Sequence, residues 1–387
     1  MDLGRKDVPI RVFSKELNFL GEIDNYTSLI YTRKWRTYNS FEFHISEFDG
    51  NLIKRGNFIL VGKDRYLSGV IEYFQDNEKE TKDITVKGYC PRSLLFNRPC
   101  FPPFGQEYDT YNTECENVIY GLIEKNCINP SNKNRVIPFL GSNASKNRGE
   151  KLSFQTTYKV ISEEIETLCA SSGLGTAVRF DPQEDIKLLF EVLEGTDRTY
   201  DNGQRPPYIF ARKLDRISER NYTESQIDYK NVAYVAGQGE GANREMITIG
   251  DDITGFDRRE LFIDARDIEE GGSLEDRGKL KLADYGLVKS FEAIVDPSDY
   301  RNKWDLGDYV TVLDDKTGIR EDRQILEVQE TFEDGCYSVE PTMGEPLKSV
   351  GAILKRSAST AIDVAYSSGS SVDVNPLSQD DIDKILV

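Results

Sequence analysis

The sequence predicts a mainly β, α+β protein with two small antiparallel β-barrels, an α/β domain between them and an extended C-terminal tail. Three observations lead to this fold class. Short alternating apolar segments separated by tight turns fill the first ninety-odd residues and return after residue 205. Apolar residues at helical spacing occupy the stretch between these two regions. After Pro341, serine and other small residues dominate, which is typical of an extended segment.

The length and charge of the chain limit its architecture and its partners. At 387 residues it exceeds the size at which a single core stops growing, so several domains are expected. Its net charge of −18 repels phosphate and argues against sequence-specific binding of nucleic acid. No secretory signal opens the sequence, and no apolar run approaches the roughly 18 residues of a membrane span. We therefore expect synthesis in the cytoplasm and no membrane partner.

The first predicted barrel covers residues 1–95. Phe41, Phe43 and Ile45 alternate with polar residues, as in a strand with one buried face. Further strand segments follow, each bounded by turn residues: Phe58–Val61, Tyr66–Gln75 and Ile84–Gly88. Strands at this spacing favour a small antiparallel barrel or sandwich.

The predicted α/β middle domain covers residues 96–204. Thr113 and Glu116 have the spacing of a capping box, which predicts a helix start. Two sets of apolar residues then recur at helical spacing: Val118, Ile119, Leu122 and Ile123, and Val160, Ile161, Ile165 and Leu168. Gly173 should end the second helix, and strands are expected at Thr176–Phe180 and Leu188–Val192.

The second predicted barrel covers residues 205–345. Its strand segments are Tyr208–Ala211, Asn231–Gly237, Lys289–Val295, Tyr309–Leu313 and Gln324–Glu330. Charged residues, including the run 264–270, interrupt this pattern and predict a helical insertion at about 241–286. Residues 346–387 form the predicted tail.

The residue inventory supplies no catalytic, cofactor-binding or metal-binding residues. His44 is the single histidine, whereas a histidine-rich metal site needs at least two ligands at set spacing. It lies in the alternating Phe41–Ser46 stretch, which predicts an outward-facing strand residue. No two of the six cysteines form a Cys-x-x-Cys pair. We expect neither a cofactor nor a metal.

Gly237, Gly239 and Gly241 follow a predicted strand, where a dinucleotide-binding fingerprint would lie. The third glycine comes one position early for that fingerprint, and Glu240 would repel a pyrophosphate. The three glycines are therefore interpreted as a structural turn, because glycine adopts positive φ without steric cost.

Paired carboxylates remain a possible catalytic device, because glycoside hydrolysis needs only two of them. Glu163, Glu164 and Glu166 fall on the polar side of the second predicted helix, where a solvated face is the favoured interpretation. A carboxylate-dependent hydrolase stays open as an alternative.

The C-terminus carries a candidate docking helix. Ser378–Asp381 has the form of a helix start, and Ile382, Ile385 and Leu386 then share one face. A helix this short does not persist alone in water, so it would fold only in the groove of a partner. The alternative is a frayed terminus without a role.

Three segments resemble phage tail proteins. Ser68–Leu95 resembles the first tube-like barrel of baseplate hub proteins from long-tailed phages and phage-tail bacteriocins. Tyr222–Gly241 is similar to the signature segment of the tail-hub family of phages that infect Gram-positive bacteria. Leu306–Val310 is similar to a turn in the closing barrel of many tail proteins. The resemblance covers roughly residues 5–345.

This resemblance implies a structural hub of the tail baseplate in a phage or tailocin particle. Each chain would supply two tail-tube-like barrels to a homotrimer, and the resulting ring would join the hexameric tail tube protein to the trimeric spike or central tip protein. Other baseplate subunits are further implied partners, and the tape-measure protein is another candidate. Some relatives carry a C-terminal peptidase or lysozyme domain, for which this chain is expected to be too short. We therefore expect no enzyme activity.

Two alternatives remain beside the hub. One is the carboxylate-dependent cell-wall hydrolase. The other is a receptor-binding or carbohydrate-binding tail module, which would need aromatic platforms on an exposed face. Only Trp35 and Trp304 offer indole rings for such a platform.

Overall fold

The computed structural model describes residues 8–77, 83–214, 216–268, 272–333 and 335–345. The described residues divide into two compact units. The first comprises residues 8–229 and 279–345, and the second comprises residues 230–278. The proposed docking residues Ile382, Ile385 and Leu386, and the whole of 346–387, lie outside the described residues.

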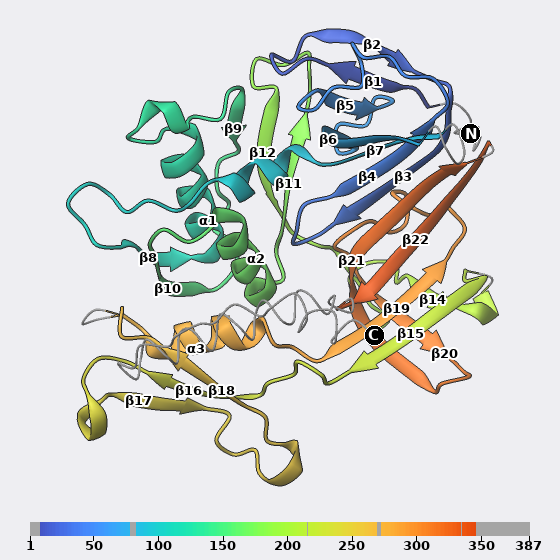
Figure 1. Cartoon of the computed structure of the whole chain (residues 1–387). Coiled ribbons are helices and arrows are strands. Elements are labelled where there is room, and N and C mark those ends of the chain that lie inside the picture. Colours follow the sequence, from blue (N-terminus) through green and yellow to red (C-terminus); the bar gives the residue numbers. More distant parts are fainter. Residues whose placement is uncertain (1–7, 78–82, 215, 269–271, 334, 346–387) are drawn as a thin grey trace, which may run out of the picture. The chain divides into compact units, whose positions relative to one another are not determined.

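The first β-region contains the four predicted strand segments and three further strands, before residue 35, that the sequence pattern did not predict. Its strands are β1 Ile10–Phe13, β2 Phe19–Ile23, β3 Tyr26–Lys34, β4 Ser40–Ile45, β5 Phe58–Val61, β6 Ser68–Asn77 and β7 Asp83–Tyr89. They pair in the order β3-β4-β7-β6-β5-β1-β2 (Figure 1). Phe41, Phe43 and Ile45 are all buried in one apolar core, which confirms the alternation of β4.

The middle region contains both predicted helices. They are α1 Cys115–Ile123 and α2 Ile161–Ser172. Two short helical turns accompany them, η1 Pro91–Asn97 and the π-turn η2 Glu124–Ile128. The strands of this region are β8 Asp109–Glu114, β9 Leu140–Ser142, β10 Lys151–Thr156, β11 Gly175–Phe180 and β12 Leu188–Leu193. Gly173 ends α2 in the left-handed conformation, as predicted.

The predicted capping box of α1 is wrong. Thr113 lies in β8, where it pairs with Leu152, and Glu114 precedes the helix without a side-chain capping bond. The Thr113 hydroxyl donates instead to the Glu114 carboxylate at 2.8 Å. Thr113 and Glu114 are thus strand residues, although the capping-box motif predicted that a helix begins there.

The second β-region contains β13 Asp197–Arg198, β14 Ile209–Ala211, β15 Glu219–Ser225, β19 Val288–Ile294, β20 Tyr309–Asp314, β21 Ile319–Glu333 and β22 Cys336–Gly344. The longest strand, β21, pairs with β20 through its first half and with β22 through its second half. That second half also pairs with β3 of the first region (Figure 1).

The pairing of β3 with β21 corrects the expectation of two separate closed barrels. The described strands of both β-regions form one 14-stranded sheet, most of it antiparallel, and its main path runs from β15 to β2 without closing on itself. A strand pattern predicts which face is buried but not which strand lies alongside, so the sequence could not reveal this continuity.

The second unit contains a three-stranded sheet. Its strands are β16 Val232–Ala236, β17 Met246–Ile249 and β18 Glu260–Asp264, in the order β17-β16-β18. The helix α3 Leu274–Ala283 begins in this unit. The stretch 241–286, predicted to be helical, therefore contains two strands as well as one helix. Its high charge reflects exposed strand faces and loops.

Candidate functional site: a buried polar junction and the sheet edges

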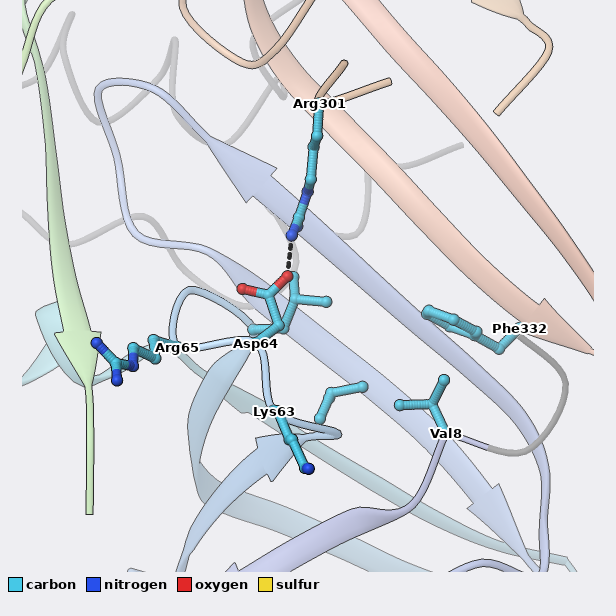
Figure 2. Close-up of a pocket in the computed structure, with 8 residues that line it drawn as sticks. Val8, Lys63, Asp64, Arg65, Arg301 and Phe332 are labelled. Atoms are coloured by element: carbon cyan, nitrogen blue, oxygen red, sulfur yellow. Dashed lines mark hydrogen bonds and ion pairs between the residues drawn. The ribbon is translucent and has the colours of Figure 1, made fainter. Parts of the chain in front are cut away.

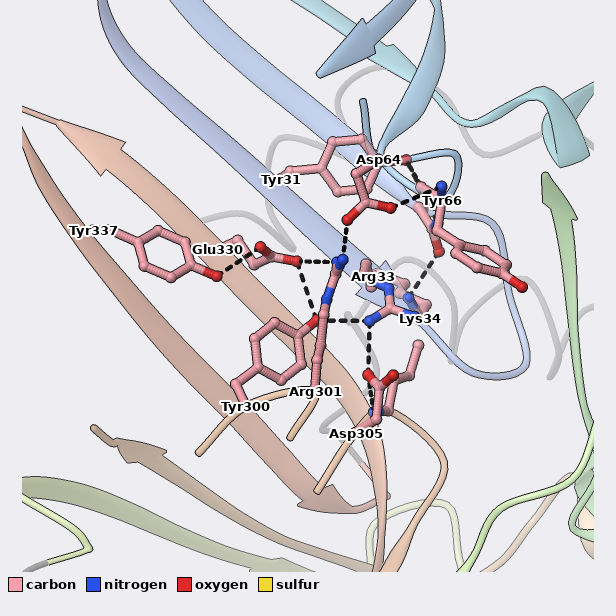
Figure 3. Close-up of polar contacts among 12 residues, drawn as sticks. Tyr31, Arg33, Lys34, Asp64, Tyr66, Tyr300, Arg301, Asp305, Glu330 and Tyr337 are labelled. Atoms are coloured by element: carbon pink, nitrogen blue, oxygen red, sulfur yellow. Dashed lines mark hydrogen bonds and ion pairs between the residues drawn. The ribbon is translucent and has the colours of Figure 1, made fainter. Parts of the chain in front are cut away.

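Glu330 of β21 is a fully buried carboxylate in the first unit. One oxygen accepts hydrogen bonds from the Tyr300 hydroxyl at 3.0 Å and from the Arg301 guanidinium at 2.9 Å. The other oxygen accepts a hydrogen bond from the Tyr337 hydroxyl at 2.7 Å. Three donors thus satisfy the buried charge (Figure 3).

Two arginines connect Glu330 to the first β-region. Arg33 of β3 donates to the Tyr300 hydroxyl at 2.7 Å and to the Asp305 carboxylate at 2.8 Å. Arg301 donates to Asp64, which lies in the turn between β5 and β6 (Figure 2). The polar junction, as we call this cluster, therefore links both β-regions through charge-assisted hydrogen bonds.

The register of β3 and β21 places these groups on one face. Glu330 lies opposite Tyr31, and Val328 lies opposite Arg33. Since residues two apart on a strand share a face, Glu330 and Arg33 occupy diagonal positions across the strand pair. The pairing that merges the two β-regions is thus the same pairing that assembles the junction.

A strained turn delivers Arg301 to the junction. Its φ is +62°, a left-handed conformation that costs a non-glycine residue free energy. Its N–H donates to the carbonyl of Trp304 at 2.7 Å, and the fully buried Trp304 ring packs at 4.9 Å from Tyr300. Packing of this turn therefore fixes the strained conformation.

Burial and neighbouring charges set the protonation of the junction. Burial raises the pKa of Tyr300 far above its usual value, so the phenol stays protonated and can donate to Glu330. Burial alone would lower the pKa of Arg33, but Tyr300, Asp305 and Glu330 outweigh it and raise that pKa. Burial, followed by the charge of Arg33, lowers the pKa of Arg301. Both guanidiniums still remain charged, because arginine titrates far above neutral pH.

A pocket of about 430 Å³ lies beside the junction (Figure 2). It is lined by Val8, Val61, Lys63, Asp64, Arg65, Leu67, Arg301 and Phe332. Its charged groups are largely paired with the protein itself, because Arg65 lies 2.7 Å from Asp181 and Arg301 binds Asp64 and Glu330. The pocket is thus lined by four apolar and four charged side chains, and three of the charged ones, Asp64, Arg65 and Arg301, form ion pairs within the protein.

This arrangement is suited to mechanical coupling. Glu330 is fully buried and accepts three hydrogen bonds from within the protein, so it is not accessible to a substrate. Among the described residues, no cluster of three or more His, Cys, Asp or Glu side chains could hold a metal ion. The junction ties two sheet regions together through buried charges that are costly to separate.

The structure also places the other residues that the sequence singled out. His44 lies on the face of β4 opposite Phe43, and its two ring nitrogens contact Asp83 at 2.6 Å and Glu42 at 3.1 Å. Gly239 and Gly241 have positive φ values of +98° and +56°. Gly237 does not, but its N–H donates to the Glu245 carbonyl at 2.8 Å.

Among the residues behind the alternative functions, Glu164 departs from the expected solvated face. Glu164 of α2 is buried rather than solvated, with Lys159 at 3.8 Å, while Glu163 is exposed. Trp35 and Trp304 are both buried, at 3% and 1% exposure, so neither indole forms an exposed platform.

The two ends of the large sheet are candidate interfaces. Among the described strands, β2 pairs only with β1 at one end and β15 pairs only with β19 at the other. Phe19 and Leu20 of β2 are 58% and 44% exposed. An unpaired apolar strand edge is a template for pairing with another chain.

Sequence reasoning missed the polar junction, although one signal was present. Val328, Glu330 and Phe332 alternate along one strand, so a carboxylate shares a face with two core residues. A carboxylate on a buried strand face requires a buried counter-charge, but the residue that supplies it, Arg301, lies on a separate turn, and Arg33 joins the network only through Tyr300.

Comparison with known proteins identifies the family. The profile of the siphovirus ReqiPepy6 Gp37-like protein family matches residues 9–345. The chain belongs to this family. A comparison with curated protein sequences finds no match.

Solved structures share the fold. A prophage tail protein, gp18, from Listeria monocytogenes EGD-e matches with a TM-score of 0.56 at 14% identity, covering 92% of this chain and 99% of that one. A tail protein from Neisseria meningitidis MC58 matches with a TM-score of 0.54 at 14% identity, covering 88% and 97%. The 43 kDa tail protein of prophage MuSo2 from Shewanella oneidensis matches with a TM-score of 0.51 at 14% identity, covering 87% and 98%. The chain thus has the fold of phage tail proteins.

None of these matches indicates an enzyme family. Within the described part of the chain, no helix is long and apolar enough to cross a membrane.

Proposed function

We propose that the chain is the structural hub of a phage-like tail baseplate, in which a homotrimeric ring joins the hexameric tail tube to the trimeric spike. The observation that carries this proposal is the tail-protein fold, which extends over nearly the whole chain. The family match supports the same setting. The tail tube protein, the spike or central tip protein and other baseplate subunits are the proposed partners, with the tape-measure protein as a further candidate.

The sheet supports a ring-forming role. Each chain offers two sheet ends, β2 and β15, whose outer edges pair with no other described strand and which neighbouring copies or tube subunits could extend. Three copies, each with two β-regions, would present six similar elements to a sixfold tube. The polar junction would hold the two β-regions of one copy in fixed register, as a rigid adaptor requires.

The domain assignment belongs to this proposal. Residues 1–95 and 205–345 would each supply one tube-like element, 96–204 the α/β domain between them, and 346–387 the docking tail. In the described structure these two elements share one sheet, so each would be an open section of the ring wall rather than a closed barrel.

Imaging of intact particles that carry a labelled copy of this chain tests the hub. The label should form a single layer between tube and spike, with threefold symmetry. A sixfold arrangement of this chain, or a label at the fibres or along the tube, would refute the proposed role.

An assay on Gram-positive cell walls separates the hub from a hydrolase. The purified chain should release no more reducing sugar or free amine than a heat-denatured control. Turnover that disappears when one pair of carboxylates is replaced would establish the hydrolase instead. The burial of Glu164 and the saturation of Glu330 give neither carboxylate access to substrate.

A further inference from the structure

We propose that an acidic loop tip of one copy docks on a basic aromatic surface of a second copy. The docking tip is the loop of residues 250–257 between β17 and β18. The receiving surface, called here the aromatic–arginine surface, consists of Arg98, Phe101, Phe104, Arg135 and Tyr158. The inference rests on the proposed ring-forming function and names surfaces through which copies would meet.

The aromatic–arginine surface exposes three rings. Phe101 and Tyr158 are 45% and 63% exposed, and their rings meet edge to face with centroids 5.3 Å apart. The Arg135 guanidinium lies 4.1 Å from the centre of the Phe101 ring. Phe104, on the following loop, is fully exposed. Phenylalanine, tyrosine and arginine gathered in this way are typical of protein interfaces.

Buried contacts hold this surface rigidly. Asn126 is fully buried in the π-turn η2, and its side-chain oxygen accepts hydrogen bonds from the Phe101 N–H at 2.8 Å and from Arg135 at 3.3 Å. Its amide group donates to the Leu122 carbonyl at 3.0 Å. Pre-ordered side chains lose little conformational entropy on binding, which favours association.

Tyr158 is held in an unfavourable backbone conformation. Its φ is +54°, and its N–H donates to the Cys100 carbonyl at 2.7 Å. The Cys100 N–H in turn donates to the Lys159 carbonyl at 2.7 Å. These two bonds fix an exposed aromatic ring in a conformation that costs free energy.

The surface carries positive charge without a local counter-charge. Within the described structure, no carboxylate lies in ion-pair range of Arg98 or Arg135, and both guanidiniums donate to carbonyl or amide oxygens. Burial and then the charge of Arg98 lower the pKa of Arg135. In a chain with a net charge of −18, this is a site that selects an acidic partner.

The docking tip has the complementary chemistry. Phe256 is fully exposed, and Gly255 beside it has a positive φ of +66° with open space around it. Asp252 and Asp257 flank this ring, are exposed, and form no ion pair with any described residue, whereas Asp251 pairs with Arg258 at 3.0 Å. The tip thus presents one apolar anchor between two free carboxylates.

A second copy is the occupant that these observations favour. Two acidic copies repel each other at most surfaces, so association needs a locally basic site on one copy and an acidic site on the other. The chain carries both, and each includes a fully exposed phenylalanine. Because the two surfaces differ, the contact is heterologous and can close into a ring.

Sedimentation velocity of the purified full chain at low ionic strength tests the contact. Wild-type protein should self-associate, and Arg98→Glu, Asp252→Arg and Phe256→Ser should each weaken that association by at least about tenfold. An equimolar mixture of the Arg98→Glu and Asp252→Arg proteins should associate again. The native surface of the Asp252→Arg protein then meets the native tip of the Arg98→Glu protein, and the reversed surface of the latter meets the reversed tip of the former. Lys54→Glu is the matched control, since it makes the same charge change at an exposed lysine outside both surfaces.

The contact is refuted if wild-type protein stays monomeric at every concentration, or if Arg98→Glu and Phe256→Ser associate like wild type. Circular dichroism of each variant identifies any loss of folding, and Phe256 on its open loop tests the contact without disturbing the core. Particle imaging keeps the two proposals separate. A threefold layer that survives Arg98→Glu would refute the contact while leaving the hub intact, whereas absence of the chain from that layer would refute the hub.

Discussion

Glu330 sits on a buried strand face, where an ionised carboxylate is tolerated only with its oxygens saturated. Tyr300, Arg301 and Tyr337 provide that saturation. Arg33 extends the same network to β3. Removing one member of this network leaves the others buried without their counter-charge. The free-energy cost of that exceeds the net stabilisation that a buried ion pair provides.

Glu330→Gln should therefore lower the free energy of unfolding by about 3 to 5 kcal/mol, because it leaves Arg33 and Arg301 short of one negative charge. Urea denaturation measures the change. Glu333→Gln is the matched control, since Glu333 is an exposed residue of the same strand, and it should change stability by less than about 0.5 kcal/mol. Equal stability of the two variants would show that the junction is not a source of rigidity.

His44 should make stability depend on pH. Burial alone would lower its pKa, but contacts with Asp83 and Glu42 outweigh burial and raise that pKa above 6.5. A raised folded-state pKa contributes stability that is fully present below the unfolded value of 6.5 and is lost as pH rises through the folded value. The difference in Tm between wild type and His44→Gln should therefore be largest near pH 5.5 and shrink toward pH 8.5. A difference that grows with pH would contradict this assignment.

At the scale of elements, β21 decides the architecture. Its 15 residues are long enough for β20 to pair with one half, and for β22 and β3 to flank the other half. A strand covering only the second half would still join β3 to β22, but β20 and its neighbours β13 and β14 would then lie outside this sheet. One long strand therefore fixes how the two regions of the first unit are joined.

We predict that the turn after β16 depends on backbone geometry rather than on a ligand. Gly239 has a φ of +98°, and a Cβ there would lie 2.6 Å from the Asn243 carbonyl oxygen. Gly239→Val should therefore destabilise the small sheet, as seen in faster hydrogen exchange of β16 and β17. Gly241→Ala is the milder comparison, because a Cβ at Gly241 meets nothing within 4 Å. Nucleotide binding to wild type in calorimetry would contradict a purely structural turn.

At the scale of the whole molecule, the acidic charge and the unpaired sheet ends have opposite effects on assembly. A charge of −18 keeps separate copies apart, whereas exposed edges such as β2 favour pairing. Assembly should then depend on local contacts that overcome the general repulsion, and it should strengthen as salt screens that repulsion. The tip contact proposed above is the exception, because salt weakens attraction between opposite charges.

The proposed docking helix is also tested on the whole particle. Deleting residues 375–387 should leave the trimeric ring and its tube contact intact, while the particles lose the spike or a neighbouring baseplate component. Mass spectrometry of purified particles measures this loss, and electron microscopy shows whether the ring remains. Particles of unchanged composition and activity would exclude a docking role for Ile382, Ile385 and Leu386.

Much of the secondary structure could be predicted from local pattern. The run Phe58–Val61 coincides with β5, and Gly173 ends α2 as the spacing indicated. The misplaced start of α1 at Thr113 arose because strand pairing, a long-range effect, overrode a local capping motif. The polar junction could not be predicted, because Arg33, Asp64 and Glu330 are brought together only by the pairing of β3 with β21.

The sequence by itself determined the mainly β class, the two helices of the middle region, the scarcity of histidine and the acidic charge, because each follows from composition or from periodicity within a short window. The tertiary structure alone decided that the two β-regions share one sheet, that Trp35 and Trp304 are buried, and that Arg98 and Arg135 lack a nearby carboxylate. Alternation fixes which face of a strand is buried, but the partner of that strand depends on contacts between residues hundreds of positions apart.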